Sequence, residues 1–123
     1  MSGISIIKDI RNELLKNTYI FETVSEGIFP YVVEEDAIYP FIVLKKNSLI
    51  PSYTKDGVVA DNIQIEINVV ADSYIKSINI AEAVRLQLEK KRFNGIFNVE
   101  LLNNSDDFVG DAYVSKMIFK LTK

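Results

Sequence analysis

The stretch that decides the fold is residues 62–88, NIQIEINVVADSYIKSINIAEAVRLQL. In its first half apolar and polar side chains alternate without a break. The apolar set is Ile63, Ile65, Ile67 and Val69, and the polar set is Asn62, Gln64, Glu66 and Asn68. Strict alternation is typical of a strand that packs one face on a core and leaves the other in water.

The second half of this stretch predicts a helix over residues 73–91. Asp72 or Ser73 is placed to accept a backbone N–H and begin it. One apolar face follows the helical period and comprises Tyr74, Ser77, Ile78, Ala81, Val84 and Leu88. The basic run at residues 90–92 lies where the C-terminus of a helix favours cations.

A second apolar side on this helix goes beyond what one sheet requires. Ile75 and Leu86 lie almost opposite Val84 on the helical wheel, and Ala83 is nearby. A helix that only covers a sheet needs a single apolar stripe. The second side therefore predicts another packed surface, which is either the N-terminal helix or a neighbouring subunit.

Further elements flank this unit. Residues 2–16 predict an amphipathic helix, with Ile6, Ile10 and Leu14 at helical spacing and Asn17 as its stop. Strands are predicted at 27–33, 96–102 and 112–121, and residues 40–71 predict a long hairpin with its tip near 53–56. Residues 103–111, NNSDDFVGD, predict a loop. We therefore expect one α+β domain: a mainly antiparallel sheet of four to five strands, with two helices on one face.

Composition narrows the function classes. The chain has 123 residues, a net charge of −3, and neither histidine nor cysteine. The usual general base and the commonest metal ligands are therefore missing, and we expect no catalytic, cofactor or metal site. An acidic chain is a poor candidate for a nucleic-acid binder. No run of eighteen apolar residues and no signal peptide is present, so we expect no membrane association.

Two acidic groups need separate consideration. Glu34, Glu35 and Asp36 are consecutive and point in different directions, which favours a solvated loop. Asp106, Asp107 and Asp111 lack the spacing of a calcium loop. Neither group carries the opposed geometry of a catalytic carboxylate pair.

The order of these pieces resembles the tail-completion, or tail-terminator, proteins of long-tailed bacteriophages and prophages. The resemblance covers nearly the whole chain and rests on order and spacing, with no single diagnostic motif. The matching blocks are Ile28-Phe29-Pro30, Pro40-Phe41-Ile42-Val43, Gln64-Ile65-Glu66-Ile67, Ala71-Asp72-Ser73-Tyr74 and Ala81-Glu82-Ala83-Val84-Arg85. Family members often carry an aromatic residue where this chain has Val69-Val70, which leaves the subfamily open.

The resemblance implies a non-catalytic subunit of a virion, assembled in the host cytoplasm. Such proteins form a ring, commonly a hexamer, that caps the tail tube and docks to the head connector, and DNA passes through the lumen without specific binding. Candidate interface residues are Ile75, Ala83, Leu86, Tyr53, Lys55, Asp106 and Asp107. Candidate lumen acids are Glu34, Glu35, Asp36 and Glu66.

Two other hypotheses stay open at this point. One is a small binding module with a pocket between sheet and helices. The aromatics that could line such a pocket, or form the core instead, are Tyr19, Phe21, Phe29, Tyr31 and Phe41. The other is an enzyme that uses carboxylate or lysine chemistry, for which no spacing nominates a residue.

Overall fold

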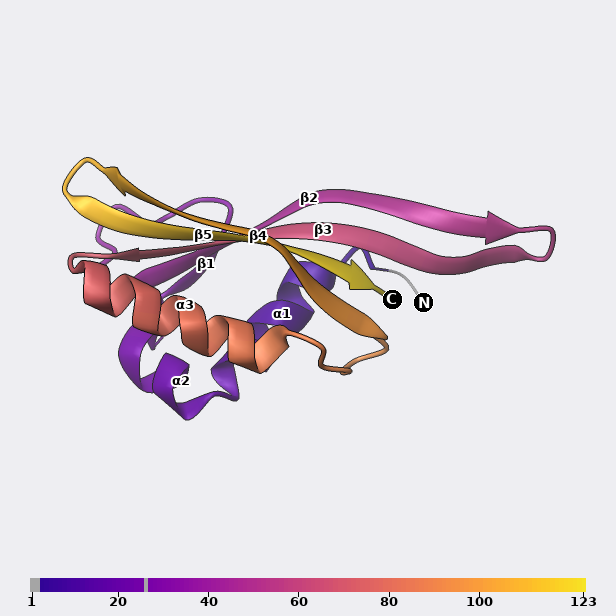
Figure 1. The fold of residues 1–123 in the computed structure, drawn as a ribbon, viewed down its shortest axis with the longest axis horizontal. Coiled ribbons are helices and arrows are strands. Elements are labelled where there is room, and N and C mark those ends of the chain that lie inside the picture. Colours follow the sequence, from indigo (N-terminus) through magenta and orange to yellow (C-terminus); the bar gives the residue numbers. More distant parts are fainter. Residues whose placement is uncertain (1–2, 26) are drawn as a thin grey trace.

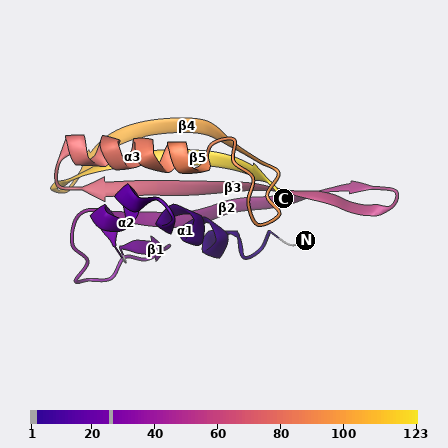
Figure 2. The same cartoon turned by 90° about the horizontal axis from the view of Figure 1, so that it is seen from below.

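The computed structural model describes residues 3–25 and 27–123 and, of Val58, the backbone alone. The elements in chain order are α1 (Ile6–Leu15), α2 (Thr18–Val24), β1 (Ile28–Pro30), β2 (Phe41–Thr54), β3 (Gly57–Ala71), α3 (Tyr74–Leu88), β4 (Asn98–Val109) and β5 (Ala112–Thr122). The sheet order is β1-β2-β3-β5-β4, and only the β1–β2 pair is parallel. All three helices lie on one face (Figures 1 and 2). The predicted α+β fold is confirmed.

The core lies between the sheet and the helices. Ile63, Ile65, Ile67 and Val69 of β3 have no exposed surface, as the alternation predicts. Several fully buried side chains of the other elements pack against them: Ile6, Ile10 and Leu14 from α1, Ile80, Val84 and Leu88 from α3, and Phe119 and Leu121 from β5. The central strand is therefore covered by elements from both halves of the chain.

The ends of α3 differ from the prediction. Ser73 occupies the N-cap position, but its hydroxyl makes no capping hydrogen bond, and the Asp72 carboxylate pairs with Lys76 at 3.7 Å. The helix stops at Leu88, and Lys90 adopts a left-handed φ of 59°. The basic run at residues 90–92 therefore lies in the connection to β4, outside the helix.

The sequence pattern does not predict the short helix α2. Asn17 is predicted to end the first helix, and in the structure it is also the N-cap of α2. Its side-chain oxygen accepts a hydrogen bond from the N–H of Ile20 at 3.1 Å. The short helix then buries Ile20 and Val24. Seven residues give too little apolar periodicity to separate a helix from a loop.

The prediction of a loop at residues 103–111 is wrong. β4 continues to Val109 and pairs with β5 along its length, with the turn at Gly110 and Asp111. Gly110 has a positive φ of 64°, as a tight turn requires. From Leu102 onward every side chain of β4 is exposed, so its composition carries no apolar face to signal a strand.

The predicted hairpin of residues 40–71 is confirmed. β2 and β3 are antiparallel along their whole length, and the turn comprises Lys55 and Asp56. Gly57 has a φ of 120°, which only glycine adopts readily.

Replacement of Ile65 by aspartate should destabilise the fold by about 4 kcal/mol or more, because it places an unpaired charge in the core. Val84→Asp should behave in the same way. Chemical denaturation monitored by circular dichroism measures the change.

The matched control is Gln64→Asp, since Gln64 is the preceding residue of the same strand and is exposed. Its cost should stay below about 1 kcal/mol, the span of strand propensities. Equal losses for Ile65→Asp and Gln64→Asp would contradict the assignment of the buried face.

Candidate interaction surfaces

The β2–β3 hairpin projects beyond the rest of the sheet (Figure 1). β5 ends opposite Asn62, so the outer part of the hairpin has no third strand beside it. We call residues 50–60 the ribbon. Its exposed apolar side chains are Ile50 at 64%, Tyr53 at 69% and Val59 at 60% of their full accessible surface. A two-stranded hairpin without a packed face is at best marginally stable in water, so a partner would complete it.

The root of the ribbon is held by both ends of the chain. Asp61 is buried, and its carboxylate accepts a hydrogen bond from the Gly3 N–H at 2.8 Å. The backbone of Asp61 exchanges two hydrogen bonds with that of Lys123, at 2.7 and 2.9 Å. The Lys123 ammonium in turn donates to Asp9 at 3.0 Å. The ribbon therefore emerges from a fixed base.

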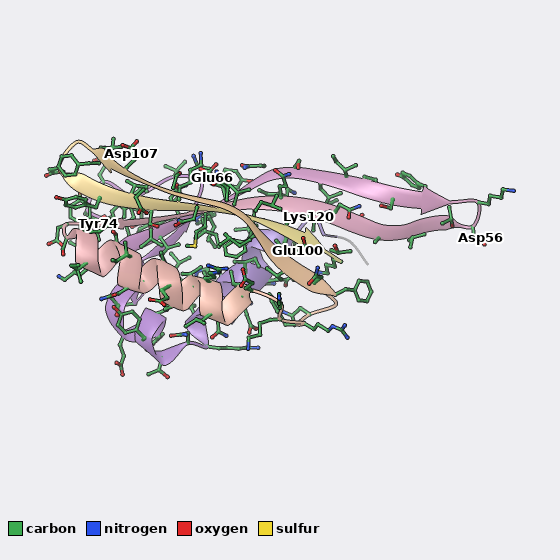
Figure 3. All side chains as sticks on the ribbon, in the orientation of Figure 1. Asp56, Glu66, Tyr74, Glu100, Asp107 and Lys120 are labelled. Carbon is green, nitrogen blue, oxygen red and sulfur yellow. The ribbon has the colours of Figure 1, made fainter. Side chains whose placement is uncertain are left out.

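The sheet face opposite the helices carries a hollow of about 530 Å³. Glu66 and Asp107 lie on this side (Figure 3). The lining is mixed in charge and polarity: Tyr31, Val33, Val43, Lys45, Glu66, Asn68, Val70, Ser105, Asp107, Val109, Val114 and Lys116. This is the wet face that the alternation predicts.

Glu66, a candidate lumen acid, is surrounded by partners. Its carboxylate accepts a hydrogen bond from Asn68 Nδ2 at 2.8 Å, and Lys116 Nζ lies 3.8 Å away. The Asn68 hydrogen bond, the Lys116 charge, a hydrogen bond from Asn47 and the Lys45 charge lower the pKa of Glu66, while partial burial opposes them. Two lysines therefore offset its charge.

The four candidate lumen acids do not form one group. Glu34 and Asp36 line a different hollow, of about 610 Å³, between α2 and the loop before β2, and Glu35 is exposed on that loop. Glu66 lies in the hollow of the uncovered sheet face. The structure therefore supports the solvated-loop interpretation of residues 34–36.

The five aromatic residues that could line a pocket or form the core are divided between exposed positions and the edge of a hollow. Tyr19, Phe21 and Tyr31 are between 44% and 55% exposed, so their assignment to the core is wrong. Phe21 and Phe29 line the hollow beside Glu34, and Phe29 packs edge-on to Phe41 at 5.9 Å. The aromatic residue of the core is Phe119.

The second apolar side of α3 is largely bare. Ile75 is 60% exposed and Leu86 is 69% exposed, while Ala83 is half-buried against the core. The helices α1 and α2 contact a different side of α3: Gln87 donates to Glu13 at 3.0 Å and accepts from Asn17 at 3.3 Å. The N-terminal helices therefore do not cover Ile75 and Leu86, and the neighbouring-subunit alternative stays a prediction.

The remaining candidate residues lie at opposite ends of the molecule. Tyr53 and Lys55 are exposed near the ribbon tip, which Asp56 marks in Figure 3. Asp106 and Asp107 are exposed on β4 near its hairpin turn. Asp106 accepts a hydrogen bond from the Tyr74 hydroxyl at 3.4 Å, beside a cluster in which the Phe108 and Tyr113 rings are 4.8 Å apart. These residues cannot form one continuous site within a single copy.

Within residues 3–25 and 27–123, no three acidic side chains gather closely enough to hold a metal ion. No helix in the same described part of the chain has the length and apolarity to cross a membrane.

Comparison with known proteins gives a likeness of fold. No protein-family model matches the chain, and no curated protein matches it. Among solved structures, a chain of the "Virion of native gene transfer agent (GTA) particle" superimposes with a TM-score of 0.77 and 14% sequence identity. The match covers 92% of this chain and 90% of that one. At this identity the likeness shows the fold alone.

Glu66 predicts a pH dependence of stability. A pKa held below the ordinary 4.5 means that its contribution is fully present above pH 4.5 and is lost as the pH falls through the folded-state pKa. Glu66→Gln should therefore lower the melting temperature at pH 7, and the difference from wild type should shrink toward pH 3. Calorimetry at both pH values tests this, and a constant difference would contradict it.

Proposed function

We propose that this chain is a structural subunit of a phage-like particle, of the tail-completion type, and that it works without catalytic turnover. Copies close into a ring, most simply a hexamer, that caps the tail tube and presents a docking face to the head connector. The subunit would be made in the host cytoplasm and end in the virion. DNA would pass through the ring without specific binding.

The observation that carries this proposal is the fold likeness to a chain of a gene transfer agent virion over nine-tenths of both chains. The sequence blocks that resemble tail-completion proteins support the same assignment independently. They fall on or next to β1, β2, β3 and α3, which all contribute side chains to the core.

The bare surfaces support head-to-tail assembly. The ribbon lies at one end of the molecule and the exposed side of α3 lies along its body (Figure 2). Two different surfaces on one chain suit heterologous contacts, which generate rings when the rotation closes. Ile50, Tyr53 and Val59 of the ribbon, and Ile75 and Leu86 of α3, are the apolar side chains available for such contacts.

The uncovered sheet face is the surface we assign to the lumen. Its acids and lysines are interspersed, and Glu66 is offset by Lys45 and Lys116. A surface with no strong positive or negative electrostatic potential would neither bind DNA tightly nor repel it. Glu66 contributes to this balance, whereas the exposed loop acids at 34–36 are better placed outside the lumen.

The direct test is co-expression with the tail-tube and connector proteins of the same particle. We expect co-purification with at least one of them, and rings in negative-stain micrographs of the complex. A monomer in isolation is compatible with the proposal, because the tube can trigger closure. If neither partner binds the monomer or the ring, the proposal fails.

Shortening the ribbon separates folding from assembly. Replacement of residues 53–59 by Asn-Gly, closed on the Ser52–Ala60 pair, should change the free energy of unfolding by less than about 1 kcal/mol, because the described side chains of this segment are exposed. Ring formation or tube binding should be lost. Light scattering and co-purification measure both effects, and unchanged assembly would exclude the ribbon from the interface.

Leu86→Asp tests the exposed side of α3. Since Leu86 is 69% exposed, the variant should keep the wild-type melting temperature within a few degrees. If this side is an interface, the variant should block ring closure while a matched change at exposed Asn79, Asn79→Asp, has a smaller effect. Loss of folding in Leu86→Asp would instead place Leu86 in the core.

A further inference from the structure

The two edges of the sheet are treated differently by this sequence. On the β1–β2 side, Pro30 ends β1. The Tyr31 hydroxyl accepts a hydrogen bond from the N–H of Lys46 at 3.1 Å and donates one to the C=O of Lys46 at 3.4 Å. Pro51 lies opposite Asp61, whose backbone bonds are both made to Lys123. The Pro51 nitrogen therefore faces outward, where it denies a donor to any added strand. At these three positions the edge is blocked against strand addition.

The β4 edge is open. The reciprocal bonds between Asp61 and Lys123 fix the register, so that odd-numbered residues of β5 bond to β3 and even-numbered residues bond to β4. Asn103, Ser105 and Asp107 face even-numbered partners. The backbone groups of Asn104 and Asp106 consequently point away from the sheet, and no described residue bonds to them.

A hollow of about 220 Å³ lies directly beneath this open edge. Met117 and Ser115 of β5 lie at its floor, and α3 forms the opposite wall with Ile78, Ala81, Glu82 and Arg85. Leu101, Asn104 and Asp106 of β4 complete the lining. An edge strand beside a helix, with a side-chain pocket between them, is the arrangement in which an extended peptide adds to a sheet.

The charges on β4 restrict what can be added. β4 carries Glu100, Asp106 and Asp107 and has neither lysine nor arginine. Two copies of β4 paired antiparallel about Asp106 would place like charges opposite each other, which is unfavourable. A basic segment would meet Asp107 and Glu100 on the uncovered face and place apolar side chains over the hollow.

We propose that the β4 edge is a strand-addition site for an extended segment of another protein, with lysine or arginine alternating with small apolar residues. The backbone of Asn104 and Asp106 supplies the pairing, and the hollow between α3 and β4 accepts a side chain. This site is separate from the ribbon and from the exposed side of α3. The proposal does not require that the chain forms a ring.

The test uses the peptide acetyl-KAKVKAK-amide and the full ¹⁵N-labelled chain. We expect saturable chemical-shift changes at the amides of Asn104 and Asp106 below 1 mM peptide, with slowed hydrogen exchange at both. The same peptide with its three central amide nitrogens methylated keeps the charge but cannot pair, and should bind at least tenfold more weakly.

Two variants at one position give the matched comparison. Asp106→Pro removes an outward N–H without touching the β4–β5 bonds and should weaken binding at least tenfold. Asp106→Asn keeps that N–H and should stay within about twofold of wild type. Melting curves check that both variants fold; if Asp106→Pro does not fold, the methylated peptide decides the question.

The proposal would be overturned if the methylated peptide bound equally well, if the shift changes mapped to another surface, or if no binding occurred at 1 mM. Concentration-dependent changes at Asn104 and Asp106 without peptide would also overturn it, because they would make a second copy of this chain the occupant. None of these results depends on the tail-tube or connector proteins.

Discussion

The burial of one face of β3 is the constraint on which the rest of the structure depends. Ile63, Ile65, Ile67 and Val69 are buried beneath helices from both halves of the chain, and all three helices lie on that face. No helix within residues 3–25 and 27–123 covers the other face, the β4 edge or the ribbon. The surfaces available to partners follow directly from how the core is closed.

The β2–β3 hairpin shows how a well-packed base can support a two-stranded ribbon that would be unstable alone. Its inner half shares the core, while its outer half is a two-stranded ribbon with exposed Ile50, Tyr53 and Val59. The bonds among Gly3, Asp61, Lys123 and Asp9 hold the point at which it leaves the sheet. The fold already fixes the backbone at the root of the ribbon. A partner therefore needs to order only the outer residues, which lowers the entropy lost on binding.

The elements that sequence predicts well are those with a single buried face. The alternation in β3 and the stripe that includes Val84 on α3 identify the core, because burial imposes a period on the chain. The sequence does not predict β4 beyond Leu102, because the side chains on both of its faces are exposed, and apolar and polar residues do not alternate there. The sequence does not predict α2, because seven residues are too few to show a helical period. Ser73 has the right identity for a cap, but local geometry gives its side chain no capping bond.

Candidate interaction sites are harder to read from sequence for a related reason. Exposure of Tyr53 and Lys55 could be predicted from the turn residues of the hairpin, and exposure of Leu86 from its place on the helical wheel. The open edge at Asn104 and Asp106 could not, since it depends on the hydrogen-bond phase of three strands. That phase is set by the pairing of Asp61 with Lys123. In the sequence, Asp61 lies 43 residues before Asn104, and Lys123 directly follows the end of β5.

The meeting of the two chain ends at the root of the ribbon has a practical consequence for handling this molecule. A purification tag or fluorescent fusion at either end would crowd the segment that most needs free space around it (Figure 1). The Gly110–Asp111 turn lies at the far end of the β4–β5 hairpin, away from that root. A small label inserted at this turn would report on the chain while leaving its projecting arm unobstructed.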